Sequence, residues 1–260
     1  MNNGNRDVIG SITVMDLAAI CELEGRELPY PFALTEHSAA IVQPESSVAT
    51  TFLDRFNTGE FRTFGPWMSA YVDADIWVEC RVHYGQEERP DARIMACRVG
   101  DTGFVATQRP EADVVDVYEL SAYGLGPAIA DLVELSNPGS RNRIAIPEYV
   151  GYFTGPATGL EDDYAMSVQI PVAVSAVRRV PSADVAALAT VQSHCRPARA
   201  WGVDWDSKFL VWVRITGDGD YVYDADFNYA EPLSQVKLGG RIDGLIAEDV
   251  NRLRRRRGLG

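Results

Sequence analysis

Four short apolar runs follow one another in the first half of the chain, and they constrain the fold more than any other feature of the sequence. The runs cover residues 76–84, 93–99, 104–108 and 114–118. They are separated by Gly85, Pro90, the Gly-Asp-Thr-Gly segment 100–103 and Pro110. Because short turns with Gly and Pro join neighbouring strands as hairpins, this pattern predicts an antiparallel β-meander.

Helices are predicted on both sides of the meander. Thr13 and Asp16 have a capping-box-like spacing and begin a helix that must end before Pro29. Its apolar face consists of Val14, Leu17, Ala18 and Cys21. A second helix is predicted at residues 45–56, and residues 64–67 are predicted to lead into a short helix or a turn. After the meander, one further helix carries Leu125, Ile129, Leu132, Val133 and Ser136 and stops at residues 137–139.

The second half repeats this order beyond a segment, residues 151–163, that is rich in Gly, Thr, Pro and acidic residues. Ser182 is predicted to cap a helix that carries Val185, Leu188 and Val191. Strands are predicted at residues 200–205, 209–215, 221–224 and 233–237. A final helix is predicted to carry Ile242, Leu245, Ile246, Val250 and Leu253.

An offset of 116 residues relates the two halves. It superposes Arg98 on Arg214, Val99 on Ile215, Gly103 on Gly219 and Gly124 on Gly240. We interpret this as an internal duplication. The predicted fold is α+β, a pseudo-two-fold repeat of an antiparallel β-meander plus a helix, with a central sheet covered by helices. We expect an N-terminal half at residues 1–150, a linker at 151–166 and a C-terminal half at 167–260, together forming one domain.

The charge of the chain disfavours a nucleic-acid partner. A net charge of -13 and a pI near 4.7 repel phosphate, which proteins bind mainly through Lys and Arg. One basic tip, Arg252 with residues 254–257, is either a solvated helix end or a site for an anionic surface. The first residues lack the pattern of a signal peptide, and no apolar run approaches the length that spans a bilayer. We therefore expect a cytoplasmic location without membrane insertion.

No motif in the sequence indicates catalysis, a metal or a cofactor. The cysteines 21, 80, 97 and 195 include no CxxC pair, and His194-Cys195 are neighbours whose side chains point apart on an extended chain. The segment 124–129 lacks the third glycine position of a dinucleotide turn. The segment beginning at Asp224 lacks the Gly and Glu that a calcium loop requires. We therefore expect a protein that is not an enzyme and has no cofactor.

Three stretches of the chain resemble the EspG family of ESX secretion-associated proteins. The first is residues 13–31, with Asp-Leu-Ala-Ala at 16–19 and Leu-Pro-Tyr-Pro at 28–31. The second is the hairpin sequence at 93–101 and 103–106. The third is the polar stretch 140–143 followed by Ile-Ala-Ile-Pro at 144–147. The C-terminal half departs more from the family pattern.

The resemblance implies a pseudo-two-fold α+β fold and a cytosolic chaperone that binds a PE-PPE heterodimer at the helical tip of the PPE subunit. It implies neither catalysis nor a cofactor. In this family the loop between the second and third strands and the C-terminal helical region contribute to the contact. The corresponding candidates are Gln86, Glu87, Glu88, Arg89 and Asp91, together with Phe227 and Tyr229. The first five are also compatible with an ordinary polar hairpin loop.

Two other classes of protein stay open at this point. In a ligand-sensing or peptide-binding module, Trp201, Trp205 and Trp212 would line a pocket on a sheet face, although strand aromatics usually form core. An enzyme would assemble its site from scattered acids such as Asp204, Asp206 and Asp218. A homodimer through a sheet edge or a helix face also stays open.

Overall fold

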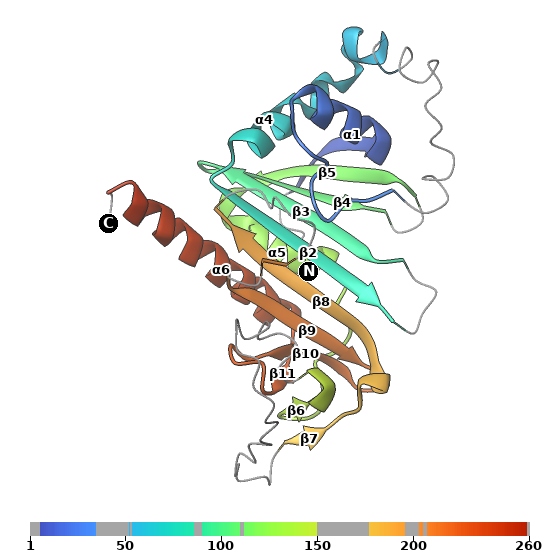
Figure 1. Ribbon diagram of the computed structural model, residues 1–260, viewed down its shortest axis with the longest axis vertical. Helices are drawn as coiled ribbons and strands as arrows, with labels where there is room; N and C mark the ends of the chain where they lie inside the picture. Colours follow the sequence, from blue (N-terminus) through green and yellow to red (C-terminus); the bar gives the residue numbers. More distant parts are fainter. Residues whose placement is uncertain are drawn as a thin grey trace, which may run out of the picture.

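The computed structural model describes residues 6–34, 52, 54–85, 90–109, 112–149, 177–195, 203–204 and 207–258. In these residues eleven strands form one sheet with helices on both faces (Figure 1). The strands are β1 (Asp7–Thr13), β2 (Ile76–Tyr84), β3 (Ala92–Val99), β4 (Thr102–Gln108), β5 (Val114–Ser121), β6 (Ile144–Ala145), β7 (Arg178–Arg179), β8 (Val185–His194), β9 (Phe209–Ile215), β10 (Gly219–Tyr223) and β11 (Ala230–Pro232). The helices are α1 (Val14–Leu23), α4 (Gly65–Asp73), α5 (Leu125–Leu132) and α6 (Gln235–Arg256).

The strand order of the sheet is β1-β5-β4-β3-β2-β8-β9-β10-β11-β6-β7. All pairs between neighbours are antiparallel except β6 with β7. The predicted α+β class and the meander β2 to β5 are therefore confirmed. From the central β2–β8 pair, the chain moves outward through three successive strands on each side, as the proposed duplication requires. The duplication itself and the division at residues 151–166 stay predictions, and that linker lies outside the described residues.

One face of the sheet is covered by α5 and α6. Alternate residues of β2 point toward these helices, because successive side chains of a strand point to opposite faces. The buried members from β2 are Ile76, Val78, Cys80, Val82 and Tyr84. They pack with Leu125 and Ile129 of α5 and with Leu238, Ile242 and Ile246 of α6. Burial of this apolar surface is the main force that holds both helices on the sheet.

The opposite face has two apolar clusters with a polar middle. At one end α1, α4 and the 3₁₀ turn Glu60–Phe64 cover β1, β5, β4 and β3, and this cluster contains the fully buried Trp67. At the other end β6 packs against β9 and β10, around the fully buried Tyr221. On this face β2 contributes Trp77 to the first cluster, and its other residues here are Glu79, Arg81 and His83. The centre of the sheet therefore carries charged side chains, whereas its ends carry apolar ones.

Helices α5 and α6 approach each other at two glycines. A Cβ on Gly126 would collide with the Asp243 carboxylate and the Gly239 carbonyl oxygen of α6. The Gly126 backbone N–H also donates a hydrogen bond to Asp243, whose pKa is nevertheless raised because the carboxyl group is buried. Gly126, in the segment that superficially resembled a dinucleotide turn, thus serves the packing of α5 against α6, together with Gly239.

One helix prediction and one strand prediction in the second half are wrong. Residues 182–184 form only a 3₁₀ turn (Ser182–Asp184), and the predicted helix at 185–191 is the strand β8. Its alternate residues Ala187, Ala189 and Val191 are buried on the face that α5 and α6 cover, and this period of two overrode the helical spacing of three. The predicted strand 233–237 is also wrong, because the Ser234 side chain accepts from the Lys237 N–H and begins α6.

The remaining predictions vary in outcome. Helix α1 begins after its Thr13 cap and ends at Leu23, as predicted. Helix α5 ends at Leu132, so Ser136 lies beyond it and instead donates to Asp220 of β10. Of the predicted helix 45–56, residues 54–56 are helical and most of the rest lies outside the described residues. Of the predicted strand 200–205, the described residues 203 and 204 are not in a strand.

Candidate partner-binding surface

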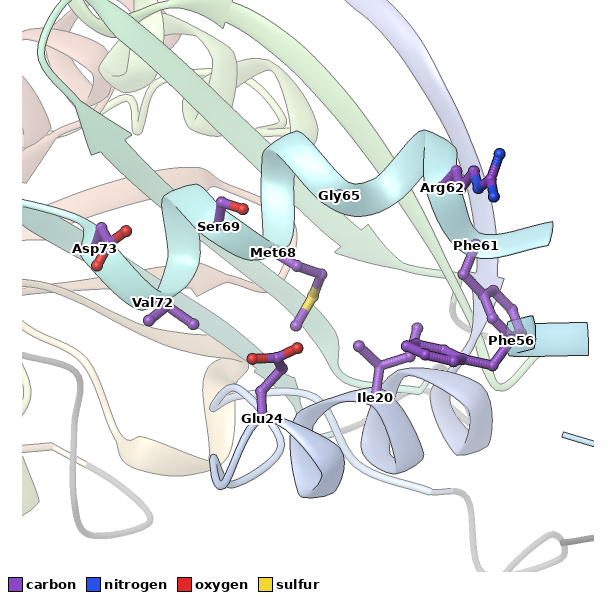
Figure 2. Close-up of a pocket in the computed structure, with 10 residues that line it drawn as sticks. All are labelled: Ile20, Glu24, Phe56, Phe61, Arg62, Gly65, Met68, Ser69, Val72 and Asp73. Atoms are coloured by element: carbon purple, nitrogen blue, oxygen red, sulfur yellow. The ribbon is translucent and has the colours of Figure 1, made fainter. Parts of the chain in front are cut away.

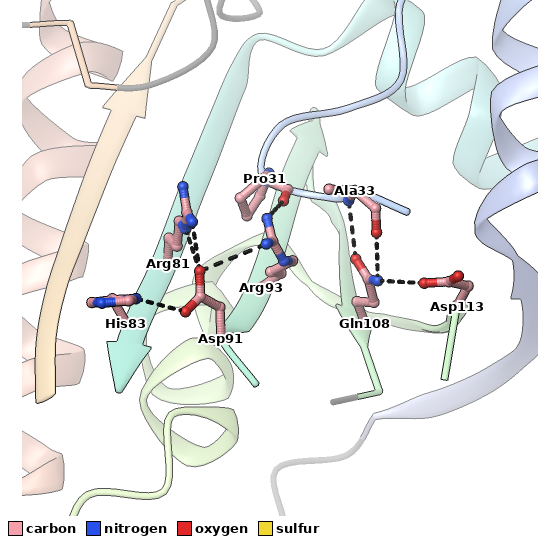
Figure 3. Close-up of polar contacts among 8 residues, drawn as sticks. All are labelled: Pro31, Ala33, Arg81, His83, Asp91, Arg93, Gln108 and Asp113. Atoms are coloured by element: carbon pink, nitrogen blue, oxygen red, sulfur yellow. Dashed lines mark hydrogen bonds and ion pairs between the residues drawn. The ribbon is translucent and has the colours of Figure 1, made fainter. Parts of the chain in front are cut away.

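Asp91, at the base of the β2–β3 hairpin, is the centre of an ion-pair cluster (Figure 3). Its carboxylate accepts hydrogen bonds from Arg81 Nε at 2.8 Å and Arg81 Nη2 at 2.5 Å. His83 Nδ1 lies 2.9 Å from Asp91 Oδ1. Arg93 Nη2 lies 3.6 Å from Asp91 Oδ2, the oxygen that also accepts from Arg81. The Asp91 side chain is only 13% exposed. Asp91 is therefore mostly buried, and its contacts are with side chains of the protein itself.

The cluster offsets a charge repulsion that the sheet register creates. Arg81 of β2 pairs directly opposite Arg93 of β3, and like charges in such a pair are destabilising. Burial and the neighbouring Arg81 charge lower the pKa of Arg93. Burial raises the pKa of Asp91, but hydrogen bonds from Arg81 and His83 outweigh it, so the pKa stays below its usual value. The ionised carboxylate thus holds both arginines in place.

The same side of the sheet also fixes the segment that follows α1. Arg93 Nη1 donates to the Pro31 carbonyl oxygen at 2.8 Å. Gln108 accepts from the Ala33 N–H at 3.1 Å and donates to the Ala33 carbonyl oxygen at 2.7 Å (Figure 3). The hairpin base, the strand β4 and the segment after α1 therefore form one connected polar unit. The candidate residues Gln86, Glu87, Glu88 and Arg89 at the hairpin tip lie outside the described residues.

The other candidates, Phe227 and Tyr229, lie in the turn between β10 and β11. The Phe227 ring stacks on Phe209 at 5.2 Å between centroids and also lies 6.2 Å from the Tyr223 ring. The Arg143 guanidinium lies over the Tyr229 ring at 4.3 Å. Both candidates are half-buried against neighbouring side chains.

The structure does not bring the two groups of candidates together. Through the ladder from β10 to β2, Tyr223 lies level with Arg81, so the turn that follows Tyr223 extends toward the Ile76 end of β2. The β2–β3 hairpin extends from the other end of that strand. A partner that contacts both groups must therefore span the sheet along the strands.

Of the residues considered for catalysis, Asp204, Asp218 and His194 have structural partners. Asp206, Trp201 and Trp205 lie outside the described residues. Asp218 accepts hydrogen bonds from the Ser140 N–H at 2.8 Å, the Tyr221 hydroxyl at 2.7 Å and Arg141 Nε at 3.1 Å. Burial raises its pKa, but these hydrogen bonds outweigh it and lower the pKa to about 2. Together with the fully buried Asp220, which accepts from Ser136 and Arg214, it fastens residues 136–141 to β10.

His194 and Cys195 do not form a dyad. His194 Nε2 lies 3.2 Å from Glu79 on the neighbouring strand, whereas the Cys195 thiol donates to the Asp249 carbonyl oxygen of α6. Trp212 is fully buried in the cluster under α5 and α6, so it belongs to the core. Asp224 accepts from the Asn228 N–H at 3.1 Å and closes a turn. Among the described residues, no group of three or more His, Cys, Asp or Glu side chains is arranged to hold a metal ion.

The ion-pair cluster was missed from the sequence, although a signal exists. Glu79, Arg81 and His83 occupy alternate positions of β2, and Asp91 and Arg93 continue that alternation where the next strand begins. Charges at alternate positions in a central strand must meet partners on one face. Read together, the two strands indicate a shared ion-pair site.

Comparison with known families agrees with this fold. The model of the EspG family matches residues 13–203 of the 260, from the cap of α1 through β8. The chain belongs to the EspG family. EspG proteins are chaperones associated with ESX secretion, and membership gives this chain that general role, including the binding of secretion substrates.

The matched EspG region includes the β2–β3 hairpin with its ion-pair cluster, and it ends before β9. The turn with Phe227 and Tyr229 and the helix α6 therefore lie outside it. No curated protein matches the chain in sequence. Within the described ranges, no helix is both long enough and apolar enough to cross a membrane.

Proposed function

We propose that this EspG protein binds a PE-PPE heterodimer in the cytoplasm, at the helical tip of the PPE subunit, and keeps it soluble for type VII (ESX) secretion. The observation that carries the proposal is the family match over residues 13–203. The chaperone acts without catalysis and without a cofactor. Its work is to cover an apolar tip that would otherwise aggregate.

The β2–β3 hairpin is the proposed contact on the N-terminal half. Its tip carries Gln86, Glu87, Glu88 and Arg89, a polar set with two acidic residues and one basic residue that suits the rim of an interface. Rim charges chiefly set the association rate and the choice of partner. The Asp91 cluster supports this proposal because it ties the hairpin base to two arginines, which reduces the entropy that ordering the loop would cost on binding.

The C-terminal contribution is proposed to come from the half-buried rings of Phe227 and Tyr229. Aromatic side chains supply large contact area with few rotatable bonds. A contact of standard size buries about 1,600 Å² in total, which is compatible with a partner that reaches from the hairpin along the strands.

Charge reversal at the hairpin tip tests the proposed contact. We expect Glu87→Lys/Glu88→Lys to lower the association rate and the affinity for a PE-PPE pair at least fivefold, because complementary rim charges steer the encounter. The matched control is Asp7→Lys/Glu119→Lys, which changes the net charge equally at two exposed positions level with Trp77, at the end of the sheet opposite to the hairpin. An unchanged affinity in the hairpin variant, measured by surface plasmon resonance, would remove the hairpin from the proposal.

A further inference from the structure

A groove of about 530 Å³ lies between α1 and α4 (Figure 2), and none of the residues of the Asp91 ion-pair cluster lines it. Its apolar wall consists of Ile20, Phe56, Phe61, Met68 and Val72. Ile20 and Met68 face each other from the two helices, and the rings of Phe56 and Phe61 close one end. The wall thus combines rigid rings with a flexible thioether, which adapts to the shape of a bound side chain.

The groove is open to solvent at its rim, whereas Ile20, Phe61 and Met68 in its floor are almost fully buried. Phe56 is 40% exposed, although it is a large aromatic side chain. Gly65 and Ser69 on its rim are also exposed. Sites for small molecules bury most of their ligand, so a long open groove with an apolar floor suits a helix of a protein partner better. The nine residues of α4 offer a length of about 14 Å, or two to three turns of such a helix.

The other end of the groove carries negative charge. Glu24 follows the last turn of α1, and Asp73 is the last residue of α4. A helix C-terminus has a partial negative charge that favours cations, yet neither helix has a basic residue in its last turn. In the described part of the chain, no Lys, Arg or His lies within 4 Å of either carboxylate. Two carboxylates and two helix ends therefore lack a cation.

We propose that this groove binds an amphipathic helix of a protein partner, with an apolar stripe on Phe56 and Val72 and a Lys or Arg side chain between Glu24 and Asp73. The apolar stripe supplies the affinity through burial. The basic side chain fixes the direction of the helix and rejects acidic partners. The surface is distinct from the contact proposed for the PE-PPE heterodimer, so it gives this EspG protein a second docking site.

A synthetic peptide tests the proposal. The probe is a fluorescein-labelled 18-residue helix of Leu and Lys, with leucines at helical spacing, and the comparison peptide has Glu in place of Lys. Fluorescence anisotropy is measured with the full-length protein at 0.15 M salt, where the Debye length of about 8 Å screens distant charges. We expect saturable binding of the Lys peptide and none of the Glu peptide.

Three variants separate groove binding from general attraction to an acidic protein. Phe56→Asp makes the protein more acidic, so general attraction would tighten binding, whereas occupation of the groove predicts a loss of at least tenfold. Glu24→Lys/Asp73→Lys should also weaken binding at least tenfold, and Glu119→Lys/Asp184→Lys should change it less than threefold. The charged positions are exposed, whereas Phe56 is 40% exposed and lies beside the Phe52 ring, so circular dichroism checks the fold of each variant before binding is measured. The proposal is overturned if the Lys peptide does not saturate, if both double variants weaken binding equally, or if Phe56→Asp does not weaken it.

Discussion

Gly126 is where the packing of α6 against α5 can be tested with one methyl group. A Cβ at this position would overlap the Asp243 carboxylate and the Gly239 carbonyl oxygen. Neither obstacle is the free end of a flexible chain, since one is backbone and the other is held by the Gly126 N–H. Gly126→Ala must therefore move the two helices apart or displace Asp243.

The expected cost follows from three contributions. Overpacking in a close contact costs about 1–3 kcal/mol. Loss of the hydrogen bond from the Gly126 N–H to Asp243 adds about 1 kcal/mol. The better helix propensity of Ala returns up to about 1 kcal/mol. The net loss in the free energy of unfolding is about 1–3 kcal/mol, which lowers the urea midpoint by roughly 0.3–1 M at an m-value of about 3 kcal/mol/M.

Gly244→Ala is the matched control on the partner helix. Nothing lies within 4 Å of a Cβ at Gly244, and the position is exposed. The same change should therefore raise stability there, by up to about 1 kcal/mol, through helix propensity alone. Urea denaturation followed by circular dichroism measures both variants. If Gly126→Ala is as stable as the wild type or more stable, the close contact between α5 and α6 is refuted.

Three further predictions concern polar contacts. Asp91→Asn should lower the free energy of unfolding by about 1–3 kcal/mol, because Arg81 and Arg93 then lose their shared carboxylate. Hydrogen exchange of the hairpin amides should become faster. Unchanged exchange would show that other contacts hold the hairpin. The pKa of Asp218 is lowered from 3.8 to about 2, so its contribution to stability is complete above pH 4 and is lost as the pH falls toward 2. Asp218→Asn should therefore flatten the acid dependence of the unfolding midpoint in that window, and an unaltered slope would contradict the assignment. Ser234→Ala removes the cap of α6 and should lower the free energy of unfolding, measured by thermal denaturation, by about 1 kcal/mol. A loss below about 0.3 kcal/mol, as for a neutral surface substitution, would argue against the cap.

The sequence was sufficient for the N-terminal meander because local signals agreed there. Strand β2 has its predicted bounds, and Gly85 and Pro90 mark the turn that follows it. The same agreement explains α1, whose Thr13 cap and apolar spacing indicate one helix. In the second half, residues 185–191 are nearly all small or apolar, so periods of two and of three fit equally well. Only the position of β8 between β2 and β9 decides for a strand.

The candidate contacts were less accessible to prediction. The family resemblance indicated the β2–β3 loop, but it did not distinguish Asp91, which is mostly buried, from the residues at the tip. The groove between α1 and α4 arises because Phe56 and Phe61 come close to Ile20, which lies more than thirty residues earlier. A contact between such distant segments depends on tertiary packing, and no local pattern specifies it.

Co-expression with PE-PPE pairs tests the central claim most directly. The tagged protein is produced together with each candidate pair from its own organism, purified through the tag and sized by light scattering after gel filtration. The account predicts a stable complex of three different chains with at least one pair, and the PE-PPE pair should stay in solution only when this protein is present. If no pair co-purifies, and each stays equally in solution without the protein, the chaperone function proposed for this chain is contradicted.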